Sequence, residues 1–425
     1  MVTLRFALLT LALIPLGTWA RPFVRDLAAA GRIATYFAFG LLTVVAEMFA
    51  LSMCNVHWSA WMLVPLPLAL TTLNVGRASA RPSLNIGRAE ARPTFVIGIA
   101  VIALTILVSA AIAAMATSGD YVYFWGVKGQ RWGAVHILDY AFTTAPSHYM
   151  HPDYPPLLPL YYAWTLLGGD GALDWWGGIL ATPLFLMTGA AAMWALGRRA
   201  RVAHIDGIAA LFVSLFALFY VRNQVAGNAE PPLHMFEAIA LAALIARKDV
   251  VASVALSAVA LTKVEGGVFV LIVCGVTWLA RERMLREKLK LSILPVATLA
   301  TWLIFAATHA LTDTYLPKDD LSIRFLGPTL IVFAQELAVR LWYLPWIAFL
   351  VIVICGRVRS AIPYLLACAV FLAFLVAVYM RAEPHNMIWS AGRTLMTPLL
   401  LLIAAAMAAH APSPAEPAEH PRSRH

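Results

Sequence analysis

Runs of apolar residues, separated by short polar stretches, follow one another along nearly the whole chain. They fall at 4–20, 33–53, 59–73, 95–117, 176–196, 207–221, 232–246, 250–262, 266–280, 291–311, 341–355, 361–380 and 393–409. A helix of about 20 apolar residues spans a bilayer, and shorter or broken ones survive when other helices surround them. The pattern predicts an all-α integral membrane protein with about 12–13 transmembrane helices.

The first run, 4–20, also has the character of a signal-peptide core. No clear small-residue cleavage site precedes Arg21, however, so we expect the run to be retained as a helix.

Basic residues gather in clusters between the apolar runs. The clusters lie at 21–32, 77–92, 198–201, 247–248, 281–290, 357–359 and in the C-terminal tail. An excess of Lys and Arg marks cytoplasmic loops. We therefore expect the loops 118–175, 222–231, 262–266, 312–340 and 381–392 to be extracytoplasmic and to form the active face. The Ala- and Arg-rich composition is compatible with a bacterium, so we expect the chain to lie in a bacterial inner membrane.

Composition excludes an ordinary soluble protein, because 61% of the residues are hydrophobic and only 12% are charged. The net charge of +9 raises the question of nucleic-acid binding, but topology explains the basic clusters and we expect no nucleic-acid partner. The four cysteines show no CxxC spacing, which indicates neither a disulfide framework nor a zinc site. Nothing in the sequence indicates an oligomeric state.

Three parts are expected along the chain. Residues 1–94 carry N-terminal helices and a basic linker, 95–409 form the main transmembrane domain, and 410–425 form a disordered cytoplasmic tail rich in Pro and Ala. The linker contains a direct repeat, LNVGRASARPS followed by LNIGRAEARPT, whose period is too short for a solenoid unit. We interpret the repeat as a duplicated segment that fixes topology.

The longest outward loop, 118–175, carries the first candidate residues. Asp120 follows the 95–117 run directly, and on its own is most simply a solvated acid at a helix end. His148, His151 and Asp153, in HYMHPDYPP, are residue types that suit a divalent metal, although a solvated interfacial cluster is the simpler interpretation. No cofactor is certain, and a divalent metal is possible. The stretch 157–167 is too short to span and is expected to lie along the outer surface.

The later outward loops add acids and cations. Glu230 precedes a proline pair in GNAEPPL, where an acid at a helix N-terminus is favoured by the helix dipole. Lys263 and Glu265, in LTKVEGG, are costly at membrane depth, which suggests function, although they also neutralise each other. The last loop carries Arg381, Glu383, His385 and Arg393.

The order of these motifs from 95 to 409 resembles the GT-C superfamily. These polytopic glycosyltransferases use lipid-linked sugar donors and include the protein O-mannosyltransferases and the lipid A aminoarabinose transferases. The resemblance rests on an Asp after an early helix, HPDYPP in the same loop, then GNAEPPL, LTKVEGG and a late GRTLMTP. It implies a GT-C-like fold with a long extracytoplasmic first catalytic loop.

The resemblance also implies roles for individual residues. Asp120 is the implied catalytic general base, and Glu230 takes the place of a second acid. Lys263 and Arg393 are the implied ligands of the lipid phosphate. The acceptor side is assigned to His151, Asp153, Tyr154 and His385.

The sequence therefore favours a glycosyltransferase that moves a sugar from a polyprenyl-phosphate donor to a lipid, glycan or protein acceptor. A single inverting displacement needs one base, and cations to stabilise the leaving phosphate. The main alternative is a secondary transporter, since broken helices and intramembrane charges also mark transport pathways. A lipid-linked glycan polymerase or ligase of unrelated fold is a third interpretation, and a structural assembly subunit explains the loop residues least well.

Overall fold

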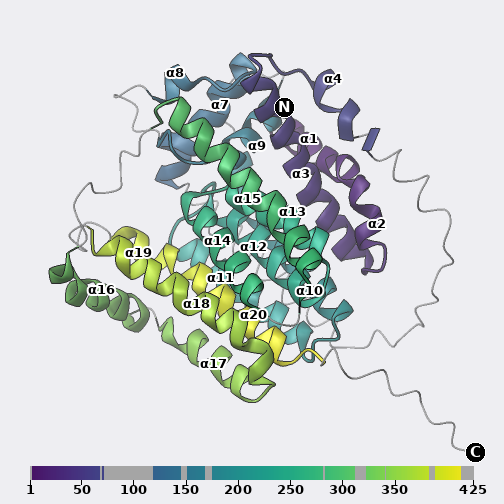
Figure 1. Ribbon diagram of the computed structural model, residues 1–425. Helices are drawn as coiled ribbons and strands as arrows, with labels where there is room; N and C mark the ends of the chain where they lie inside the picture. The colour runs from purple at the N-terminus through teal and green to yellow at the C-terminus, as the bar shows by residue number, and fades with distance from the viewer. Residues whose placement is uncertain are drawn as a thin grey trace, which may run out of the picture.

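The computed structural model describes residues 2–67, 69–70, 118–144, 151–167, 175–280, 283–311, 322–339, 341–381 and 388–412. Within these ranges the regular structure is entirely helical (Figure 1). The predicted 95–117 helix, the 73–94 repeat and the end of the tail lie outside them, as do His148, Glu383 and His385.

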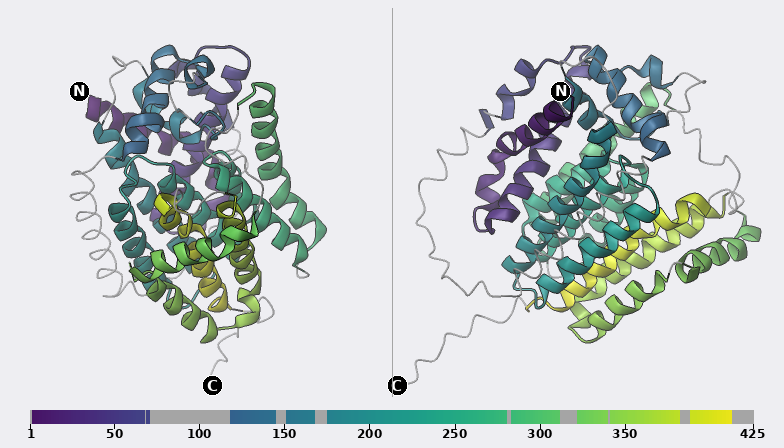
Figure 2. Two further views of the ribbon diagram at one scale, coloured as in Figure 1. Left: turned by 90° about the vertical axis from the view of Figure 1, so that its left-hand side faces the viewer. Right: turned by 180° about the vertical axis from the view of Figure 1, so that it is seen from behind.

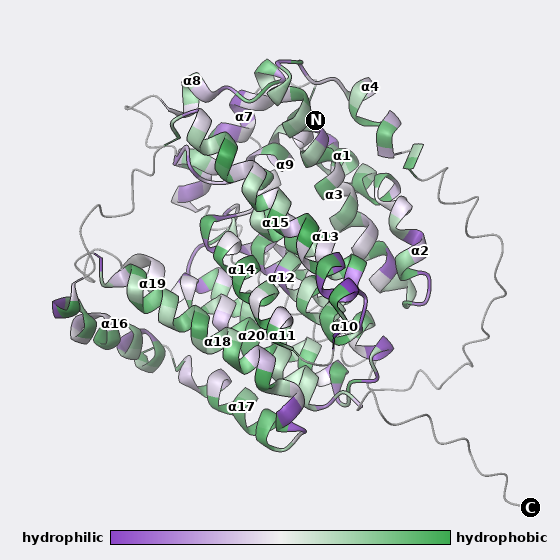
Figure 3. Cartoon of the chain, in the orientation of Figure 1, coloured by the Kyte–Doolittle hydropathy of each residue, from purple (hydrophilic) through white to green (hydrophobic). Residues whose placement is uncertain are grey.

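The prediction of an all-α membrane protein is confirmed. Seven helical segments of the described chain are long and apolar enough to cross a membrane, or eight if one sharply bent pair forms a span. The helices that make up these segments are α1 (Val2–Leu16) with η1 (Thr18–Ala20) and α2 (Arg21–Val24), α3 (Ala29–Met53), α10 (Trp175–Arg199), α11 (Ile205–Arg222), α15 (Leu285–Thr308), α18 (Val358–Tyr379), and α19 (Ile388–Thr394) with α20 (Met396–Ala409). Hydrophobic colour dominates these helices, and hydrophilic colour gathers at their ends (Figure 3).

Three shorter helices lie between the long ones: α12 (Glu230–Ile245), α13 (Asp249–Ala260) and α14 (Val264–Leu279). α12 packs against α10, α13 and α20, and α13 packs against α12, α14 and α15. Nearly every side chain of α12 and α13 is buried, so these short helices are shielded by protein as a broken membrane segment requires.

The N-terminal helices are built into the bundle. α1 and α3 approach each other through glycines, since a Cβ on Gly40 would lie 1.9 Å from the carbonyl oxygen of Leu13. α3 also packs along α10, where the Phe37 and Phe185 rings lie 6.2 Å apart. In Figures 1 and 2 α1–α3 lie on one side of the bundle, and α16 and α17 lie on the opposite side.

A helical layer covers one end of the bundle. It comprises α4 (Ala60–Leu63), the π-helix η2 (Tyr121–Trp125), α7 (Gly126–Val135), α8 (Tyr140–Thr143) and α9 (Leu157–Leu166). The expectation that 157–167 lies on the outer surface is wrong. Every residue of α9 is buried, because α7 packs over it and α1 and α3 lie beneath it.

The predicted loop 312–340 is wrong over its second half. η3 (Ile323–Phe325) and α16 (Leu326–Val339) occupy that part, and α16 is joined to α17 (Tyr343–Ile354) at a bend of 88°. α16 packs against α18 and α19, while α17 packs against α18 and α20. α16 is itself apolar along most of its length, LGPTLIVFAQELAV, so the sequence carried a helix signal that the loop prediction missed.

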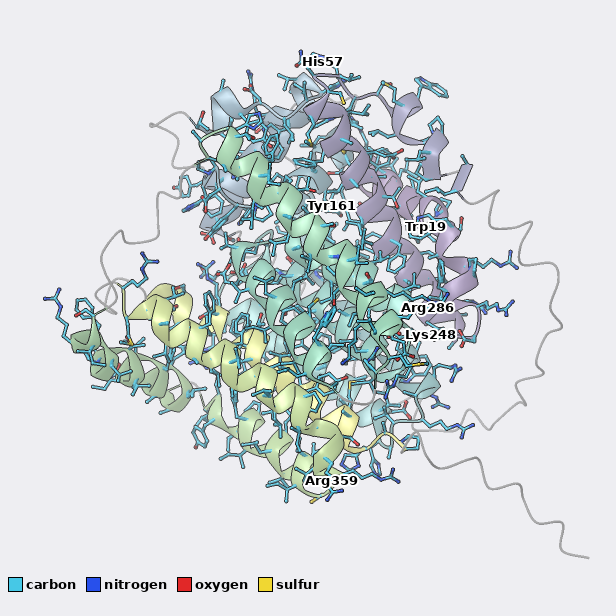
Figure 4. All side chains as sticks on the ribbon, in the orientation of Figure 1. Trp19, His57, Tyr161, Lys248, Arg286 and Arg359 are labelled. Atoms are coloured by element: carbon cyan, nitrogen blue, oxygen red, sulfur yellow. The ribbon has the colours of Figure 1, made fainter. Side chains whose placement is uncertain are left out.

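Ion pairs within the basic clusters connect helices at the end of the bundle opposite the helical layer. Asp26 binds Lys248 and Arg199, each at 2.7 Å, and Arg283 binds Asp249 at 2.5 Å. Burial opposes ionisation of Asp26, but the two cations outweigh it and lower its pKa. In Figure 4 Lys248 and Arg359 lie well away from His57, which belongs to the layer of short helices.

Candidate active site

Four side chains predicted to act together meet in one charged cluster, which we call the acid–base cluster: Asp120, Glu230, Lys263 and Arg393. The Arg393 guanidinium lies 2.5 Å from an Asp120 carboxylate oxygen and 3.6 Å from Glu230 Oε1. Lys263 Nζ lies 3.2 Å from the same Glu230 oxygen. Glu230 therefore bridges two cations that come from distant parts of the chain.

Three of these side chains lie at the ends of helices. Glu230 is the first residue of α12, and Lys263 is the N-cap of α14. The prolines after Glu230 are tolerated there because the first turn of a helix has amide groups that form no intrahelical bonds. Arg393 lies in the last turn of α19.

The helix lengths show where the cluster lies along α12 and α14. Both helices have 16 residues, so their charged ends lie about 24 Å from their opposite ends at 1.5 Å per residue. The acid–base cluster therefore lies at one end of two short helices.

The GNAEPPL motif positions Asp120. The Asn228 amide donates to Asp120 Oδ2 at 3.0 Å, and the Asn228 side-chain oxygen accepts a bond from the Ser118 hydroxyl. Gly227 has φ +83°, and a Cβ there would lie 2.6 Å from the Tyr121 ring. Only glycine fits this close approach. Asn228 and Ser118 were not predicted as site residues, although the position of Asn228 inside GNAEPPL was the available signal.

Exposure differs across the acid–base cluster. Asp120 and Arg393 keep 32% and 22% of their side chains exposed, whereas Glu230 keeps 4% and Lys263 12%. Lys263 also pairs with Glu265 at 3.1 Å. The Asp120–Arg393 pair is thus the accessible end of the cluster, and Lys263 is the deeper counter-ion of two acids.

The HPDYPP turn borders the same cluster. The Tyr154 ring stacks between His151, at 4.9 Å, and Trp125, at 5.5 Å between centroids, and its phenol lies within electrostatic reach of Arg393 and Lys263. The amide of Leu157, just after the turn, donates to the Leu261 carbonyl at 2.9 Å. This bond ties the turn to the chain segment that carries Lys263.

His151 is not part of a solvated interfacial cluster, because it is only 6% exposed. Lys128, which sequence analysis did not single out, lies buried beside it. The Lys128 ammonium donates to the His151 carbonyl at 2.7 Å and lies 5.5 Å from the Trp125 ring centroid. Burial lowers the pKa of Lys128 to about 7, even though Asp153 opposes that shift. The signal in the sequence that could have identified Lys128 was a lysine inside the aromatic run YVYFWGVKG.

The proposed metal ligands are only partly described. His151 and Asp153 flank the turn, but no group of three or more His, Cys, Asp or Glu side chains that could hold a metal occurs in the described ranges. His148 and His385 lie outside those ranges.

No protein-family model, curated protein or solved structure matches this chain.

Proposed function

We propose that this protein is a membrane glycosyltransferase that moves a sugar from a polyprenyl-phosphate donor to an acceptor hydroxyl at the extracytoplasmic interface. The observation that carries the proposal is the meeting of Asp120, Glu230, Lys263 and Arg393, two acids and two cations from separate loops. GT-C-like activity requires this combination of a base and phosphate-binding cations. The position of the cluster within a bundle of long apolar helices further supports a lipid-borne donor.

Arg393 is the proposed contact for the donor phosphate. It is the more exposed of the two cations, and its guanidinium has five N–H donors, more than the Asp120 and Glu230 contacts use. Lys263 keeps Glu230 and Glu265 compensated and adds positive charge behind Arg393. Planar Arg binds a phosphate through two parallel hydrogen bonds, which suits this position.

Asp120 is the proposed base. A phosphate at Arg393 competes with Asp120 for the guanidinium, and the released carboxylate accepts the proton of the acceptor hydroxyl. The acceptor oxygen then forms a bond to the anomeric carbon, and the bond from that carbon to the phosphate oxygen breaks. The phosphate leaves with the electron pair, and the configuration at the anomeric carbon inverts.

The decisive test is Asp120→Asn, which keeps the shape of the side chain and removes the base. We expect sugar transfer to fall at least about a hundredfold, the lower range for loss of a general base. The assay incubates the purified chain with radiolabelled polyprenyl-phosphate sugars, with and without chelator, and measures transfer to membrane acceptors. Protein abundance in the membrane should stay normal.

Asp206→Asn is the matched control. Asp206 lies near the start of α11 and accepts a bond from Trp194 at 2.6 Å, at the end of the bundle opposite the acid–base cluster. Its transfer rate should equal that of the unmodified chain. Wild-type transfer by Asp120→Asn would remove the proposed base.

A second candidate, a proton-linked transporter, is favoured by one observation. Glu230, His234 and Glu237 lie at i, i+4 and i+7 on α12, and all three are buried. His234 contacts the Tyr220 hydroxyl at 2.9 Å, and Glu237 accepts from Thr397 at 3.0 Å. Buried titratable residues spaced along a membrane helix are typical of proton pathways. Proton-driven flux through proteoliposomes that contain no acceptor would favour this function over transfer.

A further inference from the structure

A basic segment that the proposed reaction does not use leads into α15. Residues 281–290 read RERMLREKLK, and their five basic and two acidic residues leave a net charge of +3 at pH 7. The described part of this segment lies at the end of the bundle opposite the acid–base cluster, because Arg283 pairs with Asp249, and in Figure 4 Arg286 lies beside Lys248. The segment is therefore separate from the candidate active site.

Arg286 and Lys290 are the two cations of this segment that remain available to a ligand. Both are exposed, and neither forms an ion pair among the residues that the structure describes. They are four residues apart on α15, so they project from the same face of the helix about one turn apart. Glu287, the acid between them, accepts a bond from the Met284 amide at 3.0 Å as part of the helix cap. The two cations can therefore bind one anion together.

The other described cations of the segment already have partners. Arg283 pairs with Asp249 at 2.5 Å, and the Lys288 ammonium donates to the Trp278 carbonyl at 2.7 Å. The Trp278 indole in turn donates to the Ser292 hydroxyl at 2.9 Å. These last two bonds join the end of α14 to the start of α15, so the available cation pair projects from a fixed helix end.

An apolar stripe runs along α15 from this cation pair. Leu285, Leu289 and Ile293 recur every four residues and are 61%, 38% and 61% exposed. Leu303 and Ile304, which are also exposed, continue the stripe to a length of about 28 Å at 1.5 Å per residue. This length is close to the thickness of a hydrocarbon core, and α15 is a membrane-spanning candidate. The stripe therefore faces acyl chains.

The cations and the stripe belong to one surface. Arg286 precedes Ile293 by seven residues, which is two helical turns, so the two side chains lie on the same face of α15. Trp278, a residue type enriched at membrane–water interfaces, is 42% exposed at the same end of the bundle. The surface thus changes from charged to apolar where a lipid headgroup meets its acyl chains.

An anionic phospholipid matches both parts of this surface. A soluble acidic peptide or a nucleic acid would pair with the cations but leave the apolar stripe uncovered. A zwitterionic lipid would cover the stripe, but its own ammonium compensates its phosphate. Basic residues beside a membrane helix attract anionic lipids, whose headgroups carry a net negative charge.

We propose that the start of α15 binds an anionic phospholipid, with its phosphate between Arg286 and Lys290 and its acyl chains along Leu285, Leu289 and Ile293. This binding does not depend on the proposed transfer reaction, because the site shares no residue with the acid–base cluster. It gives the basic segment a role beyond the orientation of the chain.

The test is photo-crosslinking of the full chain in nanodiscs with phospholipids that carry a diazirine on one acyl chain. Phosphatidylglycerol is the anionic probe, phosphatidylcholine with the same acyl chains is the zwitterionic comparison, and peptide mass spectrometry locates the crosslinks. We expect crosslinks to residues 285–293 to be at least about fivefold more frequent with phosphatidylglycerol, the value of one cation near an anionic lipid. The double variant Arg286→Gln with Lys290→Gln should lower them to the level of phosphatidylcholine.

Arg222→Gln with Arg324→Gln is the matched control, because it removes two exposed arginines at the other end of the bundle and changes the net charge equally. Its crosslinks to residues 285–293 should equal those of the unmodified chain. Unchanged phosphatidylcholine crosslinks in both double variants would show that α15 stays in place in the membrane. Equal crosslinking by the two lipids, or a preference for phosphatidylglycerol that persists in Arg286→Gln with Lys290→Gln, would overturn the proposal.

Discussion

Lys128 shows how one side chain links stability to pH in the layer above the bundle. Lys128 is 1% exposed, and its ammonium supports the HPDYPP turn through the His151 carbonyl. Burial lowers its pKa in the folded chain to about 7, from an ordinary value of 10.5. The unfolded chain therefore binds more protons between these two values, so the contribution of Lys128 to the unfolding free energy rises with pH across that window.

Replacing Lys128 with Met should remove this dependence. We expect Lys128→Met to have a higher apparent Tm than the unmodified chain at pH 7, where charge burial costs most, and the difference to shrink as pH approaches 9.5. Thermal unfolding of both proteins in nanodiscs, followed by intrinsic fluorescence from pH 7 to 9.5, measures it. Arg131→Met, on the exposed side of the same helix, should show no such pH trend. A Tm difference between Lys128→Met and the unmodified chain that stays constant at every pH would contradict the lowered pKa of Lys128.

At the scale of helices, the acid–base cluster joins the N-terminal ends of α12 and α14 to α19. Glu230 and Lys263 form the buried centre of this joint, with 4% and 12% of their side chains exposed. Removal of one partner from a buried ion pair leaves an uncompensated charge and costs about 3–5 kcal/mol, whereas removal of both charges costs far less.

A single and a double variant test this ion pair between α12 and α14. Lys263→Met should lower the unfolding free energy by about 3 kcal/mol or more, because Glu265 loses its counter-ion and Glu230 keeps only Arg393, at 3.6 Å. The double variant Glu230→Gln with Lys263→Met should recover part of that stability without recovering transfer, because Glu265 still lacks its counter-ion. Denaturation midpoints and transfer rates measured on the same preparations check both expectations. Equal stability of the single and double variants would show that the pair is not coupled.

At the scale of the whole molecule, the ion pairs and basic clusters at one end and the layer of short helices at the other predict a fixed orientation. Cys54 and Cys355 are both exposed, and they lie at opposite ends of the bundle. Cys54 follows α3 beside the helical layer, where the amide of Trp58 donates to the His136 carbonyl at 2.7 Å. Cys355 follows α17, where the amide of Arg357 donates to the Ala409 carbonyl at 2.7 Å.

These native cysteines report sidedness. In intact cells a membrane-impermeant maleimide should label Cys54 in the Cys355→Ala variant, and should label Cys355 in the Cys54→Ala variant only after permeabilisation. Cys274 and Cys368 are buried and should stay unlabelled in both. Labelling of Cys355 alone in intact cells would invert the predicted topology and place the acid–base cluster at the cytoplasmic face.

Sequence by itself determined the helical membrane class, because hydropathy is a local property that survives any arrangement of the helices. The bounds of α3, α10, α11 and α18 fall within a few residues of the predicted runs for the same reason. The choice of Asp120, Glu230, Lys263 and Arg393 came from the resemblance to GT-C enzymes, and their roles remain a prediction.

Tertiary structure alone decided that these four side chains meet, since Asp120 and Arg393 are 273 residues apart and no periodicity encodes such a contact. It also decided that α9 is buried, because coverage by α7 depends on packing rather than on the length of the run. The supporting role of Asn228 likewise appears only once the fold brings Asp120 beside it. Local hydropathy thus determines which segments enter the membrane, and contacts between distant segments determine where the chemistry lies.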